Sequence, residues 1–249
     1  DIHTGQVQME MTVNRTGRLE GENRNAPGSC RISYQGQPIA QCRLSQTSTG
    51  SLTAETVIPK EHLHLWTTDA PNLYDVEISY GKDRVASYFA LRQFGRAKDK
   101  DGIWRFTLND KPFFFNGVLD QGYWPDGLLT APSDAALLFD IQKLKALGFN
   151  TIRKHIKIEE ERFYYHCDRL GMAVWQDMPN GGGAMNLFFV TDLPNAFPSF
   201  GRKVKDNHYR LFKRKDAKGR EQFYQDLTGM VELLRDYPCI ALWTPFNEG

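Results

Sequence analysis

The chain has 249 residues, of which 41% are hydrophobic and 24% are charged, proportions that are typical of a globular protein and exclude wholesale disorder. Its 31 Lys and Arg residues nearly balance 30 Asp and Glu residues, so the net charge of +1 argues against a dedicated nucleic-acid binder. Apolar runs all fall short of the ~20 residues of a membrane-spanning helix, so we predict a soluble chain without a membrane partner.

The first 94 residues are predicted to form an all-β domain. Alternating hydrophobic residues mark a strand over 6–13, with Val7, Met9, Met11 and Val13 on one face. Further short strands are predicted at 29–34, 39–44, 52–58, 74–80 and 85–94, separated by clusters of Gly, Pro, Asn and Ser. Six short strands without helical periodicity predict an immunoglobulin-like β-sandwich over 1–94.

The four cysteines are too few and too scattered for a disulfide scaffold or a zinc ribbon. Cys30 and Cys42 could pair if their strands are neighbours, but buried free thiols are the favoured interpretation. The chain begins at Asp1 without a signal peptide and stops at Gly249 directly after a motif-like run. We therefore expect a piece of a larger protein. The sequence leaves open whether that protein is cytoplasmic, periplasmic or secreted.

The pattern changes after a polar, turn-rich stretch at 95–102, which is predicted to be a linker or a domain boundary. A continuous apolar run at 113–119 indicates a strand buried on both faces. A helix is predicted from the N-cap Ser133 to the terminating Gly148. Further helices are predicted at 159–170 and 222–236, further strands at 149–152, 172–175 and 240–246, and an irregular stretch at 179–219.

Alternation of strands and helices over 95–249 predicts about four parallel β/α units. A closed eight-stranded barrel takes roughly 250 residues, more than follow residue 94. Two alternatives remain: a small open sheet, or the first half of a TIM (β/α)8 barrel. A half barrel exposes unpaired strand edges, which favours self-association as a homo-oligomer.

Polar side chains follow each predicted parallel strand, where the loops of β/α folds form functional sites. They are Asp120 after the first strand, Arg153 and His155 after the second, Asp177 after the third, and Asn247 with Glu248 after the fourth. Taken singly, each has a structural explanation as a helix cap, a loop tie or an ion-pair partner. Taken together, the positions at four strand ends favour a site.

Five motif-like runs occur along the chain: L-W-T-T-D-A-P-N-L-Y at 65–74, F-N-G-V-L-D-Q-G-Y-W-P-D-G at 115–127, G-F-N-T-I-R-K-H at 148–155, C-D-R-L-G-M-A-V-W-Q-D-M-P at 167–179 and L-W-T-P-F-N-E-G at 242–249. In this order they resemble glycoside hydrolase family 2, which includes β-galactosidases, β-glucuronidases and β-mannosidases. The resemblance implies an immunoglobulin-like domain over 1–94, followed by the front half of a catalytic barrel over 95–249. It also implies a sugar-binding-type β-sandwich upstream of this sequence.

The resemblance further implies retaining hydrolysis of a β-linked oligosaccharide or glycoside, without a cofactor. Matched motif by motif, Glu248 is the general acid/base, Asn247 contacts the sugar hydroxyl beside the reacting carbon, and Arg153 orders the carboxylates. The family's nucleophile is a second glutamate on a later strand, and no residue of this sequence matches it. Retaining cleavage needs two carboxyl groups about 5–5.5 Å apart, so hydrolysis by this chain alone is not expected.

Loop residues near these positions are candidates for sugar binding. Tyr123 and Trp124 could stack on a sugar ring or pack within their loop. Two loops depart from the common family pattern: Asp120-Gln121-Gly122 replaces a His- and Glu-containing loop, and His155 stands two places after Arg153 instead of three. The galactoside, glucuronide and mannoside alternatives therefore stay open. The rivals are a non-catalytic carbohydrate-binding or spacer module and a small open-sheet enzyme of another family.

A basic segment at 201–220 holds nine Lys and Arg residues against Asp206 and Asp216. A solvated insertion loop is the favoured interpretation, and a further hypothesis is that it overhangs the site and favours an acidic sugar. The glycines at 181–183 lack the spacing of a phosphate-binding loop. The six histidines are dispersed, so no metal site is predicted.

Overall fold

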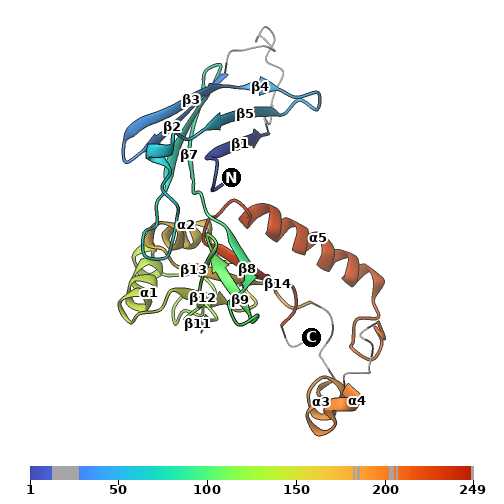
Figure 1. Cartoon of the computed structure of the whole chain (residues 1–249). Coiled ribbons are helices and arrows are strands. Elements are labelled where there is room, and N and C mark those ends of the chain that lie inside the picture. Colours follow the sequence, from blue (N-terminus) through green and yellow to red (C-terminus); the bar gives the residue numbers. More distant parts are fainter. Residues whose placement is uncertain (13–27, 182, 184–185, 202–204, 206, 248–249) are drawn as a thin grey trace. The chain divides into compact units, whose positions relative to one another are not determined.

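The computed structural model describes residues 1–12, 28–181, 183, 186–201, 205 and 207–247. It divides into two compact units, Asp1–Phe114 with Asp168–Gly171, and Phe115–Cys167 with Met172–Gly249. Figure 1 shows the helices and strands of both units.

Two antiparallel sheets of the first unit share one hydrophobic core. Their strands are β1 (Gln6–Met11), β2 (Gly28–Tyr34), β3 (Gln37–Arg43), β4 (Ser45–Gln46), β5 (Leu52–Val57), β6 (Tyr74–Tyr80) and β7 (Asp83–Phe89). One sheet has the order β1-β5-β4 and the other β3-β2-β6-β7. The core takes Val7 and Ala54 from the first sheet and Ile32, Tyr74 and Val76 from the second. The alternation predicted for β1 is confirmed as far as Met11, whereas Val13 lies outside the described residues.

Cys30 and Cys42 lie directly opposite each other on the neighbouring strands β2 and β3. Both are free thiols, as predicted, but only Cys30 is buried as expected, whereas Cys42 is partly exposed. Burial, together with the smaller effect of the adjacent Cys42, raises the pKa of the Cys30 thiol to about 12.

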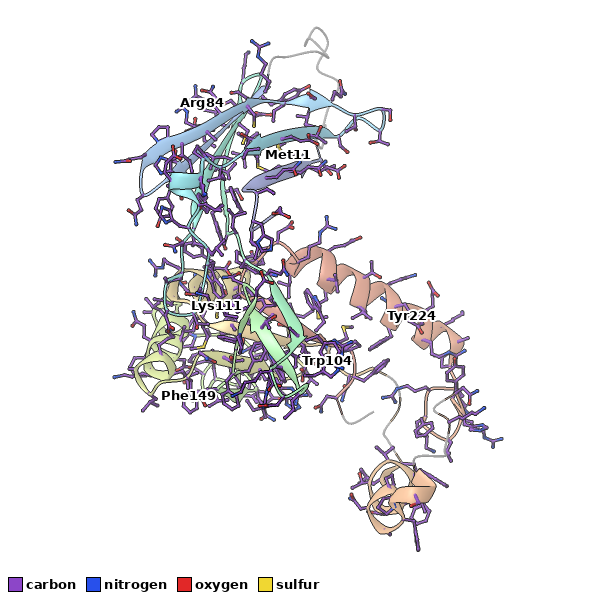
Figure 2. All side chains as sticks on the ribbon, in the orientation of Figure 1. Met11, Arg84, Trp104, Lys111, Phe149 and Tyr224 are labelled. Carbon is purple, nitrogen blue, oxygen red and sulfur yellow. The ribbon has the colours of Figure 1, made fainter. Side chains whose placement is uncertain are left out.

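The linker predicted at 95–102 is wrong, because a third antiparallel sheet begins there. It consists of β8 (Phe94–Lys98), β9 (Trp104–Leu108) and β10 (Lys111–Pro112) in the order β10-β9-β8. Trp104, which Figure 2 labels on β9, has the cationic groups of Arg96 and Lys98 at 5.0 and 5.6 Å from its ring centroid. Cation–π contacts of this kind attract the charged side chains of β8 to the aromatic ring on β9. The strand predicted at 85–94 is accordingly split between β7 and β8.

The second unit is built on a four-stranded parallel sheet. In chain order its elements are β11 (Gly117–Asp120), α1 (Asp134–Ala146), β12 (Thr151–Lys154), α2 (Glu161–Leu170), β13 (Ala173–Asp177), α5 (Ala217–Leu234) and β14 (Ile240–Thr244). The strand order β11-β12-β13-β14 follows the chain, and Figure 1 shows α1 and α2 beside the sheet. The predicted alternation of strands and helices is confirmed.

Local signals explain where α1 begins and ends. The Ser133 side chain accepts a hydrogen bond from the backbone N of Ala136 at 3.2 Å, which confirms the predicted N-cap. Gly148 has φ +87°, and its N–H donates to the carbonyl of Lys145 at 2.9 Å. A glycine adopts this left-handed conformation without a steric penalty, so the helix ends there.

Two predictions for this unit are wrong. The run at 113–119 is not a strand buried on both faces, because only Gly117–Asp120 is a strand and Leu119 is 54% exposed. Among the described strands β11 has one neighbour, β12, so one of its edges is open. The stretch at 179–219 is not irregular throughout: it contains a π-helix (Phe188–Asp192) and the short helices α3 (Leu193–Ala196) and α4 (Pro198–Gly201).

Candidate functional site

Parallel pairing brings the carboxyl ends of the four strands to one edge of the sheet. Asp120 and Asp177 are the last residues of β11 and β13, and Arg153 is the penultimate residue of β12. Asn247 follows the end of β14 at Thr244. These four are among the five predicted strand-end residues that the structure describes, and the fifth, His155, directly follows β12. All five therefore lie where β/α folds carry their functional groups.

Arg153, Asp177 and Asn247 form one hydrogen-bonded group, which we call the arginine group. The Arg153 guanidinium donates to both carboxylate oxygens of Asp177, from Nε at 3.1 Å to each and from Nη2 at 2.9 Å to Oδ2. The same Nη2 donates to Oδ1 of Asn247 at 2.8 Å. The Asp177 side chain is fully buried and that of Arg153 is one third exposed. A buried fork of this kind fixes the arginine plane and, through it, the amide of Asn247.

Glu248 lies outside the described residues. Its neighbour Asn247 is held from two sides, because Asn180 Nδ2 also donates to the Asn247 carbonyl at 3.3 Å. The backbone that leads to Glu248 is therefore tied to β12 through Arg153 and to the segment after β13 through Asn180.

Asp120 lies in a different cluster from the arginine group. Its Oδ2 is 2.8 Å from Nζ of Lys154, which also pairs with Oε1 of Glu159, and Lys157 Nζ reaches the same Glu159 oxygen at 2.7 Å. We call Asp120, Lys154, Lys157 and Glu159 the lysine–carboxylate cluster. Arg153 and Lys154 are consecutive strand residues and so point to opposite faces of the sheet.

Sequence reasoning missed Lys154, Lys157 and Glu159. The side chains of Lys154 and Glu159 are only 1% and 2% exposed, although charged residues are rarely buried unless they are paired. Strand parity provides a signal that could have identified Lys154: if Arg153 faces the site, the next residue faces the helices. The pairing with Glu159 depends on how the loop folds, which the local sequence does not specify.

His155 connects the loops that follow β11 and β12. Its backbone N–H donates to the carbonyl of Asp120 at 2.9 Å, and its ring Nδ1 is 3.3 Å from Nε2 of Gln121. The predicted residues Asp120 and His155 are thus in one neighbourhood. The structure does not bring either of them into the arginine group by a hydrogen bond among the described residues.

Trp124 lines a pocket of about 600 Å³ together with Asp120, Tyr123, Asp140, Lys154 and Phe163. Its indole Nε1 is buried without a hydrogen-bond partner among the described residues, whereas Tyr123 is 67% exposed. Partial burial raises the pKa of Asp140, the negative charge of Asp120 adds to the increase, and Lys154 opposes it. No residue of the arginine group lines this pocket.

Arginines in the described part of the basic segment hydrogen-bond to backbone carbonyls of the same loop region. Arg214 Nη1 donates to the carbonyls of Gly183 and Phe212, and Arg220 Nη1 donates to the Arg214 carbonyl at 2.7 Å. The Arg220 guanidinium also lies 4.2 Å from the ring centroid of Tyr209. Several of these charges therefore serve loop structure.

The described residues contain neither a membrane-spanning helix nor a metal-binding cluster. None of the helices there is long and apolar enough to cross a bilayer. Within the same residues, no group of three or more His, Cys, Asp or Glu side chains is arranged to hold a metal ion.

Comparison with known proteins gives consistent matches. The family model described as "Glycosyl hydrolases family 2, TIM barrel domain" matches residues 100–249. A β-galactosidase of Leuconostoc mesenteroides is 24% identical over 81% of this chain, and a β-glucuronidase of Streptococcus agalactiae is 28% identical over 75%. A β-mannosidase B of Emericella nidulans is 26% identical over the whole chain. The chain spans 17%, 29% and 27% of the length of these three relatives.

Solved structures show the same fold. A Bacteroides uniformis β-glucuronidase matches 100% of this chain and 28% of its own with a TM-score of 0.68 at 17% identity. A β-galacturonidase from Eisenbergiella tayi, bound to galacturonate, matches 89% of this chain and 34% of its own with a TM-score of 0.62 at 18% identity. Because the family model covers more than half of the residues, the chain belongs to glycosyl hydrolase family 2 and carries sequence of its TIM-barrel domain.

Proposed function

We propose that this chain is part of a retaining β-glycosidase, with an immunoglobulin-like domain over 1–94 and the first half of a TIM barrel over 95–249. Two sheets that share one core support the first assignment. Four parallel strands in chain order, joined by helices, support the second. The proposed catalytic domain supplies the proton donor and the groups that orient it.

In this proposal Glu248 is the general acid/base that protonates the leaving oxygen. The observation that carries it is the arginine group: Arg153 binds both buried Asp177 and Asn247, the residue before Glu248. A proton donor needs a fixed position and a nearby anionic carboxylate that raises its pKa. Asn247, held by its amide oxygen on Arg153, keeps its NH2 group available to bind a sugar hydroxyl.

The second carboxylate of the pair is placed on a strand later than β14, outside this sequence. Retaining cleavage forms a bond between that carboxylate and the sugar while the leaving oxygen takes the proton of Glu248. Water then releases the sugar, and Glu248 acts as base on that water. The proposed substrate is a β-linked glycoside. The residues proposed to line or support its binding site are Asp120, His155, Asp177 and Trp124.

The test is Glu248→Gln in the full-length protein. We expect turnover to fall by about 10²–10⁴-fold on glycosides with poor leaving groups and much less on activated aryl glycosides, because only the former need protonation. The matched control is Glu232→Gln, an exposed carboxylate on α5, which should leave both rates unchanged. Unchanged turnover of Glu248→Gln on both substrate types would sink the assignment.

A panel of aryl β-glucuronide, β-galactoside and β-mannoside identifies the sugar. If the basic segment favours an acidic sugar, the glucuronide should be cleaved fastest. Equal rates on glucuronide and neutral glycosides would remove that hypothesis. Absence of a strand-end glutamate in the reading frame beyond Gly249 would instead favour the non-catalytic carbohydrate-binding or spacer module.

A further inference from the structure

The lysine–carboxylate cluster hydrogen-bonds to the backbone of the loop Gln121–Trp124, which carries residues of the proposed binding site. Lys157 Nζ donates to the carbonyl of Gly122 at 2.8 Å, and Asp120 Oδ1 accepts from the N–H of the same residue at 2.8 Å. Both polar groups of one peptide residue are thus held by charged side chains. Charge-assisted hydrogen bonds of this kind are about twice as strong as neutral ones.

The close packing of Gly122 against the cluster also restricts the position of the loop. Gly122 has φ +66°, and a Cβ atom at this position would clash with Oε1 of Glu159 and lie 2.7 and 2.8 Å from Nζ of Lys154 and Lys157. The loop backbone therefore lies directly against three charged groups. A glycine is required both by its backbone conformation and by the closeness of the cluster.

The cluster is itself anchored to rigid elements. Gln176 of β13 donates from Nε2 to the Lys157 carbonyl at 2.7 Å and accepts from the hydroxyl of Tyr164 at 2.7 Å. The same hydroxyl accepts from the backbone N of Glu159 at 3.1 Å. Lys157 and Glu159 are therefore fixed by β13 and α2, and they transmit that position to Gly122.

Burying these charges is a poor route to stability. Desolvation of paired charges offsets most of their attraction, so hydrophobic residues of similar volume often stabilise a fold as well or better. Lys154 and Glu159 are nevertheless almost fully buried and lie against Gly122, whose next residues are Tyr123 and Trp124. The arrangement fits a role in fixing geometry.

We propose that Lys154, Lys157 and Glu159 are positioning residues that hold the loop Gln121–Trp124, so that Tyr123 and Trp124 meet a bound β-glycoside at a fixed place. The part of this proposal that concerns the substrate rests on the proposed function. The part that concerns restraint of the loop rests only on the hydrogen bonds and contacts of the cluster. The two parts are therefore tested separately.

The first experiment measures amide hydrogen exchange of Gln121–Trp124 in the full chain carrying Lys157→Met. We expect exchange in this loop to be about tenfold faster than in the wild type, with β13 unchanged, because local opening loses its tether. The control is Lys100→Met, the same chemical change at an exposed lysine. Equal loop exchange in both variants overturns the proposal. If Lys157→Met does not fold, Gly122→Ala displaces the loop with every charge retained and should give the same acceleration.

The second experiment measures kinetics of the full-length protein on its best aryl β-glycoside. Lys157→Met should raise KM about tenfold with kcat within threefold, Lys157→Arg should restore most of the loss, and Lys100→Met should match the wild type. An unchanged KM together with faster loop exchange overturns the role in substrate positioning. Failure of the proposed function differs from this outcome, because the wild type would then cleave no glycoside while the exchange result still decides whether the cluster holds the loop.

Discussion

At the scale of single residues, Arg153 and Lys154 form two separate sets of ion pairs on opposite faces of β12. Arg153 holds Asp177 and Asn247, whereas Lys154 holds Asp120 and Glu159. Asp177 has no solvent exposure, so its charge depends on Arg153 for compensation. The proposed site therefore rests on a buried charge pair whose loss should affect folding as well as catalysis.

Arg153→Met tests this dependence. Removing one partner of a buried pair leaves an uncompensated charge and should lower the free energy of unfolding by about 3–5 kcal/mol. Urea denaturation of the chain measures the change. The exposed Arg162, which pairs with Glu160, provides the control: Arg162→Met should leave the free energy of unfolding nearly unchanged, because solvent screens an exposed ion pair.

A double variant separates the charge from the lost packing. Arg153→Met with Asp177→Asn removes the stranded carboxylate, so it should be more stable than Arg153→Met alone. Equal stability of the two would mean that Asp177 tolerates its buried charge without Arg153. That result would contradict the account of the arginine group.

Strand-end logic predicted the members of the arginine group, because consecutive parallel strands deliver their last residues to one edge. It could not predict that Asp120 pairs with Lys154 and not with Arg153. That partnership depends on which face each side chain takes and on the loop that carries Glu159 back to the strand. The face of Lys154 follows from strand parity, but the path of the loop that carries Glu159 does not follow from the spacing of polar residues along the chain.

At the scale of elements, helices with strong end signals were the most predictable. Ser133 and Gly148 bound α1 as predicted, whereas α5 begins at Ala217 behind the N-cap Asp216, before the predicted start at 222. The sheet β8-β9-β10 was missed because its residues are mostly polar or exposed. Its strands are defined by pairing with each other, which a search for buried runs does not detect.

Ser133→Ala tests how much the α1 cap contributes. The variant lacks the side-chain hydroxyl, so the N–H of Ala136 loses its side-chain acceptor and keeps only the Ser133 carbonyl at 3.1 Å. The free energy of unfolding should therefore fall by about 1 kcal/mol. Ser133→Asp is the matched variant, because the aspartate carboxylate can still accept the capping hydrogen bond. Its negative charge also interacts favourably with the positive N-terminal end of the helix dipole. A loss of equal size in both variants would contradict the capping role.

At the scale of the whole molecule, the parallel sheet leaves β11 and β14 with one neighbour each among the described strands. Leu119 on β11 and Phe246 after β14 are 54% and 57% exposed. In a closed barrel both strands would have a second neighbour and such side chains would be covered. The half-barrel proposal therefore predicts how this polypeptide behaves by itself.

We expect the purified 249-residue chain to self-associate, with a mean mass by light scattering above the 28.6 kDa of one copy and rising with concentration. The physical cause is pairing at the open edges and burial of the exposed apolar side chains. A longer polypeptide that supplies four further β/α units should close the sheet and remove the concentration dependence. A concentration-independent mass of 28.6 kDa for the short chain would contradict the half barrel and favour a small, self-sufficient open sheet.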